Sequence, residues 1–209
     1  MTVRDAIRGF YAVLDRDDEA LARVLAAHSR VLQVRIKPRG RLVDTAELVR
    51  IARMARRVCD DAGIALVVND RVDVALAVAA DGVHLGQTDL PVEAARRVAG
   101  DRLWIGVSTH DLQQVREACA AGADYLGFGP VFATATKQNP DPVQGISMLA
   151  RAVEAADGRP VVAIGGITPA AAAAVYATGV QAICAISAVN DAADRSGAAR
   201  ALGSAPTSG

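Results

Sequence analysis

The sequence is poor in aromatic residues and cysteine, and both shortages narrow the possible folds and functions. Only 3% of its 209 residues are aromatic although 52% are hydrophobic, so the core must be aliphatic, as in buried parallel strands covered by helices. The cysteines, Cys59, Cys119 and Cys184, are widely spaced, with no C-x-x-C pair that would indicate zinc or redox chemistry. We interpret them as reduced packing thiols.

The sequence has no excess of acidic or basic residues, and it has no long apolar segment. Acidic and basic residues balance at 23 each, which argues against a nucleic acid or an anionic membrane as partner. No stretch reaches the roughly 18 uncharged apolar residues of a membrane helix, and Arg4, Asp5 and Arg8 interrupt the N-terminal segment where a signal peptide would lie. We expect a soluble, cytoplasmic protein with small-molecule substrates. A homo-oligomer is compatible with the sequence, which does not identify its interface.

Lysine is almost absent. Of the 23 basic residues, only Lys37 and Lys137 are lysines. A surface charge tolerates either arginine or lysine, whereas a site that needs a compact, rotatable charge against phosphate oxygens favours lysine. Lys137 also ends a stretch, residues 127–137, that runs from an apolar segment into a loop holding Thr134 and Thr136. We therefore take both lysines as candidate phosphate ligands, with chance survival as the alternative.

Short apolar segments alternate with segments of helical periodicity along the whole chain. The expected strands lie at residues 9–15, 31–37, 64–69, 82–85, 103–108, 124–128, 160–165 and 181–187. The helical patterns lie near residues 18–28, 45–62, 71–80, 91–98, 111–121, 146–156, 169–178 and 188–202. This alternation without a linker predicts an α/β fold, a single (β/α)8 barrel over residues 1–203, rather than two domains. The tail, 204–209, has nothing to bury, and we expect it to be disordered.

Polar residues follow most of the expected strands, at the carboxyl ends where such barrels carry their reactive groups. Gln33, Arg35 and Lys37 alternate along one strand, so they should share a face, while Val34 and Ile36 face the helices. The other strands lead to Asn69, Asp70, Asp89, Ser108, His110, the loop with Thr134, Thr136 and Lys137, the pair Gly165 and Gly166, and Ser187.

Two groups of these residues suit anions or a metal ion. Gly165, Gly166 and Ser187 follow the last two strands, where many barrels hold a phosphate at backbone N–H groups; a tight turn is the alternative. Asp70 and Asp89 lie at the mouths of adjacent strands and suit Mg²⁺, which takes one or two carboxylates together with substrate phosphate oxygens. Helix capping is the alternative for both aspartates.

The cationic residues suggest a second anion site. Together with a metal ion, Arg35, Lys37 and Lys137 would neutralise a diphosphate, which carries more charge than one monophosphate. Two anion sites in one barrel mouth suggest that two phosphorylated substrates are joined. His84 and His110 fit either acid/base catalysis or a buried hydrogen-bonding role, and the sequence leaves both interpretations open.

Five ordered segments resemble the thiamine-phosphate synthase family. They are Gln33-x-Arg35-x-Lys37, residues 68–73 (VNDRVD), 80–91 (ADGVHLGQTDLP), 127–137 (GFGPVFATATK) and 163–167 (AIGGI). The similarity runs in collinear order from residue 9 to about residue 190. One departure is Ile36, where the family usually has Glu; we expect this side chain to face outward, so the site is retained.

The resemblance implies a (β/α)8 barrel and a transferase. Its reaction couples hydroxymethylpyrimidine diphosphate with thiazole phosphate to give thiamine monophosphate and pyrophosphate, with Mg²⁺ assisting the departure of diphosphate. By position, the resemblance implies that Asp70 and Asp89 bind Mg²⁺. It also implies that the diphosphate is bound by Arg35, Lys37, Asn69 and Lys137, and that the pyrimidine or the leaving group is contacted by Gln33 and Ser108. The thiazole phosphate would be bound by Thr134, Thr136, Gly166 and Ser187. Gly165, in the same turn as Gly166, is a further expected substrate-binding residue. Lys137, Ser108 and Arg35 are the expected catalytic residues.

Three other functions are alternatives to this one. A thiazole tautomerase of the same superfamily tends to carry His where this chain has Pro130, and it loses parts of the diphosphate and metal set. A sugar-phosphate isomerase barrel would fit the Gly165-Gly166 pair alone. A non-catalytic sensor of thiamine precursors need not keep leaving-group chemistry, which the intact set of Arg35, Asp70, Asp89 and Lys137 argues against.

Overall fold

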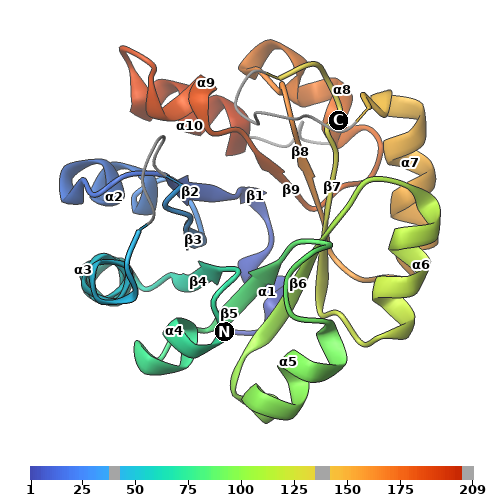
Figure 1. The fold of residues 1–209 in the computed structure, drawn as a ribbon. Helices are drawn as coiled ribbons and strands as arrows, with labels where there is room; N and C mark the ends of the chain where they lie inside the picture. Colours follow the sequence, from blue (N-terminus) through green and yellow to red (C-terminus); the bar gives the residue numbers. More distant parts are fainter. Residues whose placement is uncertain (38–42, 135–141, 204–209) are drawn as a thin grey trace.

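Parallel strands form a barrel that is surrounded by helices, as the sequence pattern predicts (Figure 1). The computed structural model describes residues 1–37, 43–134 and 142–203. The strands are β1 (Gly9–Phe10), β2 (Ala12–Leu14), β3 (Val31–Val34), β4 (Ala65–Asn69), β5 (Gly82–Leu85), β6 (Trp104–Thr109), β7 (Tyr125–Phe128), β8 (Val161–Ile164) and β9 (Ala182–Cys184). The predicted disordered tail, 204–209, lies outside the described residues, so that expectation stays a prediction.

One segment closes the ring of strands. β1 pairs with β9, and β2 pairs with β3, while Tyr11 between them donates its N–H to the carbonyl oxygen of Ile183 at 2.8 Å. Residues 9–14 therefore act as a single strand whose first half contacts the last strand and whose second half contacts the next one. All other neighbouring strands are also parallel, which confirms the predicted (β/α)8 barrel.

The helices follow the predicted order, with two differences. They are α2 (Glu19–Ala26), α3 (Thr45–Ala62), α4 (Val72–Ala77), α5 (Val92–Ala99), α6 (Leu112–Ala120), α7 (Gly145–Ala155), α8 (Ala172–Tyr176), α9 (Ser187–Asn190) and α10 (Arg195–Gly203), with short 3₁₀ turns η1 (Gly100–Arg102) and η2 (Pro169–Ala171). A further helix, α1 (Val3–Ala6), was not expected. It packs Ala6 against side chains inside the barrel.

The helix predicted over residues 188–202 is wrong as a single element, because the chain breaks between α9 and α10. Asn190 donates its side-chain amide to the carbonyl oxygen of Val13 at 3.0 Å and to Asp15 at 2.9 Å. Asp194 then starts α10, since its carboxylate accepts the backbone N–H of Gly197 at 2.8 Å. The alanine-rich sequence suits a helix throughout, so the local pattern did not reveal this tertiary anchor.

Two apolar cores lie on opposite faces of the strands. The outer core lies between strands and helices and includes Leu32, Val34 and Leu66. The inner core fills the barrel and includes Tyr11, Tyr125, Val67 and Val162. Alternate residues of a strand point to opposite faces, so the polar residues that share the inner face continue from this core toward the carboxyl ends of the strands.

Candidate active site

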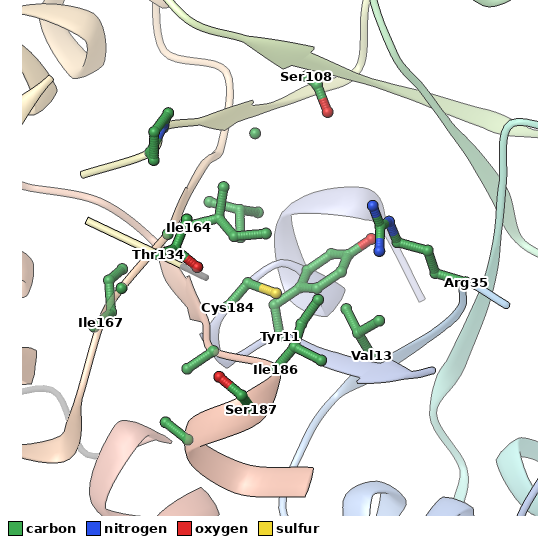
Figure 2. A pocket seen from close by; sticks show the side chains of 18 of the residues that line it. Tyr11, Val13, Arg35, Ser108, Thr134, Ile164, Ile167, Cys184, Ile186 and Ser187 are labelled. Atoms are coloured by element: carbon green, nitrogen blue, oxygen red, sulfur yellow. The ribbon is translucent and has the colours of Figure 1, made fainter. Parts of the chain in front are cut away.

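A cavity of about 550 Å³ lies at the carboxyl ends of the strands. Figure 2 shows Arg35, Ser108, Thr134 and Ser187 approaching it from different sides. Eight of the predicted substrate-binding residues line it: Gln33, Arg35, Asn69, Ser108, Thr134, Gly165, Gly166 and Ser187. Most of the residues predicted to bind substrate therefore lie together at one cavity. Thr136 and Lys137 lie outside the described residues.

Strand β3 places its polar residues as the alternation predicts. Gln33 and Arg35 line the cavity, and Gln33 is only 4% exposed. Val34 is buried in the outer core, and Ile36 packs against that core. The backbone N–H of Arg35 donates to the carbonyl oxygen of Leu14 at 2.9 Å, so the hydrogen bonding to β2 continues past the end of β3 and places Arg35 at the cavity.

Lys37, Asp70 and Asp89 meet beside the cavity rather than on its wall. The ammonium of Lys37 lies 3.2 Å from a carboxylate oxygen of Asp70. The carboxyl groups of Asp70 and Asp89 lie within hydrogen-bonding reach of each other. Burial and this neighbouring carboxyl raise the pKa of Asp70, and Lys37 opposes the shift. Two acidic groups and one cation are thus held in a single cluster.

The backbone fixes both aspartates in this cluster. Asp70 has a φ of 64°, a left-handed conformation that Asp tolerates at some energetic cost, and its N–H donates to the carbonyl oxygen of His84 at 2.8 Å. The carboxylate of Asp89 accepts the N–H of Gly86 at 2.7 Å. Neither α4 nor α5 has a side-chain cap, so the structure contradicts the capping alternative for Asp70 and Asp89.

The turn after β8 packs on the loop after β7. Val131 donates its N–H to the carbonyl oxygen of Ile164, and Phe132 donates to that of Gly165, both at 2.9 Å. Gly165 and Gly166 have φ values of 98° and 64°, and a Cβ at Gly166 would overlap the backbone of the β7 loop. Glycine is required here by backbone conformation and by this close contact, and the contact brings Thr134 to the same wall of the cavity.

The wall formed by β8 and β9 ends in hydroxyl groups and glycine. Ser187 is the first residue of α9 and lines the cavity together with Thr134, Gly165 and Gly166. Backbone N–H groups beside a hydroxyl provide donors for a phosphate monoester. Apolar side chains, among them Ile164 and Ile186, lie between this wall and Arg35 (Figure 2).

Two tyrosines that the sequence did not indicate join the predicted site residues into a hydrogen-bonded chain. The side-chain amide of Gln33 donates to the hydroxyl of Tyr11 at 2.9 Å, and that hydroxyl lies 2.9 Å from the hydroxyl of Tyr125. Tyr125 is 3.1 Å from Nδ1 of His84, and Nε2 of His84 is 2.9 Å from the hydroxyl of Ser108. The period-two alternation of their strands is a signal that could have placed both tyrosines inside.

Burial keeps the side chains of this hydrogen-bonded chain uncharged. It raises the pKa values of Tyr11 and Tyr125, so both hydroxyls stay protonated. Burial, together with the positive charge of Arg35, lowers the pKa of His84 to about 4. A neutral imidazole donates from one nitrogen and accepts at the other, which fits the buried hydrogen-bonding interpretation of His84 rather than a charged acid.

His110 and Cys184 also line the cavity. Nδ1 of His110 lies 2.5 Å from the carbonyl oxygen of Gly129. Burial raises the pKa of the Cys184 thiol to about 12. This thiol is therefore protonated and packs as a small apolar group. Cys59, Cys119 and Cys184 are free cysteines in the described chain.

Among the described residues, no helix combines the length and apolar character that crossing a membrane requires.

Comparison with known proteins identifies the family. A family model for thiamine monophosphate synthase matches residues 10–189. The thiamine-phosphate synthase of Methanocella arvoryzae is 45% identical over 88% of this chain and 84% of its own length. The bifunctional protein ThiM/ThiE of Symbiobacterium thermophilum is 49% identical over 88% of this chain, which spans 37% of that relative. The structure of thiamine phosphate pyrophosphorylase from Pyrococcus furiosus matches with a TM-score of 0.84 and 38% identity over 96% of each chain. The chain belongs to the thiamine monophosphate synthase family.

Proposed function

We propose that this chain is a transferase that joins hydroxymethylpyrimidine diphosphate to thiazole phosphate, giving thiamine monophosphate and pyrophosphate. The observation that carries the proposal is a cavity with two walls whose polar groups suit anions. Arg35 and Asn69 line it on one side, with Lys37 and the aspartates beside them, and Gly165, Gly166 and Ser187 line the other. A barrel that binds one monophosphate has no need for both walls.

The β3 and β4 wall suits the diphosphate. A guanidinium from Arg35, the ammonium of Lys37 and the amide of Asn69 supply donors to phosphate oxygens. Lys137, which lies outside the described residues, would add a second ammonium. These cations would stabilise negative charge as it builds on the departing diphosphate, and this differential stabilisation lowers the barrier.

The aspartate pair fits a magnesium ion. Carboxylate oxygens are hard ligands, and the carboxyl groups of Asp70 and Asp89 lie within hydrogen-bonding reach of each other. Burial and this neighbouring carboxyl raise the pKa of Asp70, so a divalent cation would relieve the repulsion between the two groups. Asp70 and Asp89 would hold the ion. When bound, Mg²⁺ supplies positive charge to the oxygens of the leaving diphosphate.

The reaction needs no covalent nucleophile from the protein. The bond between the pyrimidine methylene carbon and the diphosphate oxygen breaks, and its electron pair leaves with diphosphate. The thiazole nitrogen donates its lone pair to the same carbon and becomes the positively charged thiazolium nitrogen. Arg35 and Lys37 would balance the charge of the leaving group, and the apolar side chains of Val13, Ile164 and Ile186 would keep water from the reactive carbon.

The test is product formation by the purified protein. With both substrates and Mg²⁺, we expect thiamine monophosphate and pyrophosphate in equal amounts, and no product when either substrate is omitted or when EDTA removes the metal. Release of pyrophosphate can be followed with a coupled phosphate assay, and thiamine monophosphate by fluorescence after oxidation to the thiochrome.

The same assay distinguishes the tautomerase. Pro130 lines the cavity at the position where tautomerase relatives tend to carry His, so this chain is expected to leave thiazole tautomers unchanged. Tautomer exchange without release of pyrophosphate would replace the proposed reaction with the tautomerase. Binding of both substrates without either reaction would support the sensor.

A further inference from the structure

In the hydrogen-bonded chain from Gln33 to Ser108, the orientation of the Gln33 amide can determine which group donates at every link. The side-chain NH₂ of Gln33 donates to the hydroxyl of Tyr11. The proton of that hydroxyl then needs an acceptor, and the oxygen of Tyr125 lies 2.9 Å away. Tyr125 would in turn donate to Nδ1 of His84, 3.1 Å away, which would leave the imidazole proton on Nε2, facing the hydroxyl of Ser108 at 2.9 Å. A buried hydroxyl that lacks an acceptor destabilises the folded state, so the donor at one link determines the donor at the next.

Turning the Gln33 amide over would reverse every link. Its oxygen would accept from Tyr11, Tyr125 would donate to Tyr11, and the imidazole proton of His84 would move to Nδ1. Ser108 would then donate to Nε2, leaving no proton for a ligand. The tautomer of His84 therefore reports the direction of the whole chain.

We propose that Tyr11 and Tyr125 are positioning residues that fix the tautomer of His84 and so make the hydroxyl of Ser108 a donor to the bound substrate. In the same direction the amide oxygen of Gln33 is an acceptor. An aminopyrimidine carries an amino donor and ring-nitrogen acceptors, the complement of this pair. The assignment to the pyrimidine rests on the proposed function, whereas the direction of the chain does not.

The residues that pack around Tyr11, Tyr125 and His84 accommodate the three rings. Tyr125 is fully buried and Tyr11 is 3% exposed, with ring centroids 6.1 Å apart. Gly106 lies in regular strand β6, where glycine weakens the strand. A Cβ at this position would overlap the ring of Tyr125, which explains why glycine is needed there. A Cβ at Gly127 would lie 3.2 Å from the imidazole of His84. Small residues on two strands thus leave room for the rings.

The direct test is nitrogen NMR of the histidine side chains in the protein without substrates. The chain has only three histidines, so the variants His28→Gln and His110→Gln assign the His84 signals. We expect the proton of His84 on Nε2. A proton on Nδ1 would overturn the proposal.

The relay is tested by changing its far end. Gln33→Glu, measured at pH 8.5, replaces an amide by a carboxylate that only accepts hydrogen bonds, so it should reverse the chain and move the His84 proton to Nδ1. Adding Tyr11→Phe should abolish this response. Adding Tyr176→Phe should not, because the hydroxyl of Tyr176 bonds the carbonyl oxygen of Leu202 at 2.7 Å, outside the chain. An unchanged tautomer in Gln33→Glu, or a shift that survives Tyr11→Phe, would contradict the relay.

Turnover tests the link to catalysis. Tyr125→Phe keeps the ring and removes one hydroxyl, and we expect kcat to fall about tenfold with an unchanged KM for thiazole phosphate, while Tyr176→Phe keeps normal kcat. Unchanged kcat in Tyr125→Phe would overturn the catalytic part. If the native protein formed no thiamine monophosphate, the proposed function would fail, while the NMR result would still decide the direction of the chain.

Discussion

At the scale of single residues, the site holds groups that oppose folding. Burial and the neighbouring carboxyl group of Asp89 raise the pKa of Asp70, and the backbone of Asp70 is left-handed, with a φ of 64°. A raised pKa means that the folded state holds its proton to higher pH than the unfolded state. The pair therefore costs stability as pH rises above the ordinary aspartate pKa, and this cost disappears in acid.

Asp89→Asn should separate stability from activity. Without metal at pH 8, removing one carboxylate should raise Tm by about 2–4 °C, the shift that roughly 1 kcal/mol produces in a chain of this size, and the gain should vanish near pH 3. Mg²⁺ should raise the Tm of the native protein but not of the variant. Turnover should fall about a hundredfold or more, the scale of losing one transition-state charge contact. Calorimetry and the pyrophosphate assay measure both effects.

The control is Asp101→Asn, which changes an exposed aspartate on η1, ahead of β6. It should leave Tm, the Mg²⁺ effect and turnover unchanged. Lys137→Ala, at a position outside the described residues, should lower turnover on the same scale as Asp89→Asn. Near-normal rates in both Asp89→Asn and Lys137→Ala would contradict the roles assigned to these residues.

The site residues that could be predicted from the sequence are polar residues at the carboxyl end of a strand, on the face that points into the barrel. Gln33 and Arg35 alternate on one strand and end at the cavity. Tyr11 and Tyr125 could not be assigned in this way, because an aromatic residue in a strand is equally typical of an apolar core. Their hydroxyl partners come from strands far apart in the sequence, so only the folded barrel brings them together.

At the scale of elements, the loops after β7 and β8 form one unit. Two backbone hydrogen bonds join residues 131–132 to residues 164–165, and Gly166 packs against the carbonyl oxygen of Ala133. The sequence predicted a phosphate-binding turn at Gly165 and Gly166, but not its contact with the other loop. The split between α9 and α10 was missed for the same reason, because a tertiary contact decides it.

Gly166→Ala should disturb this unit. The new methyl group would meet both a positive φ and the backbone of the β7 loop, so we expect a loss of more than about 1 kcal/mol and a rise in KM for thiazole phosphate. Gly63→Ala is the matched control, since Gly63 has a φ of 67° with nothing within 4 Å of its Cβ position. It should lose about 1 kcal/mol and keep its KM. An equal KM in the two variants would contradict the placement of the thiazole phosphate.

At the scale of the whole molecule, parallel order explains why scattered residues form one site. Every strand delivers its carboxyl end to the same rim, and residues 9–14 close the ring between β9 and β3. The alternation of apolar and helical segments was enough to predict this architecture, since each unit repeats the same pattern. The alternation does not determine which polar groups touch across the rim, such as Lys37 and Asp70, which lie 3.2 Å apart.

The most direct test of the central claim, two anion sites in one cavity, is a crystal structure of the protein with Mn²⁺, pyrophosphate and thiazole phosphate. The account predicts an anomalous Mn²⁺ peak between Asp70 and Asp89, pyrophosphate on Arg35 and Lys37, and the thiazole phosphate at Gly166 and Ser187. Both anions on the same wall, or a metal ion away from the two aspartates, would contradict it.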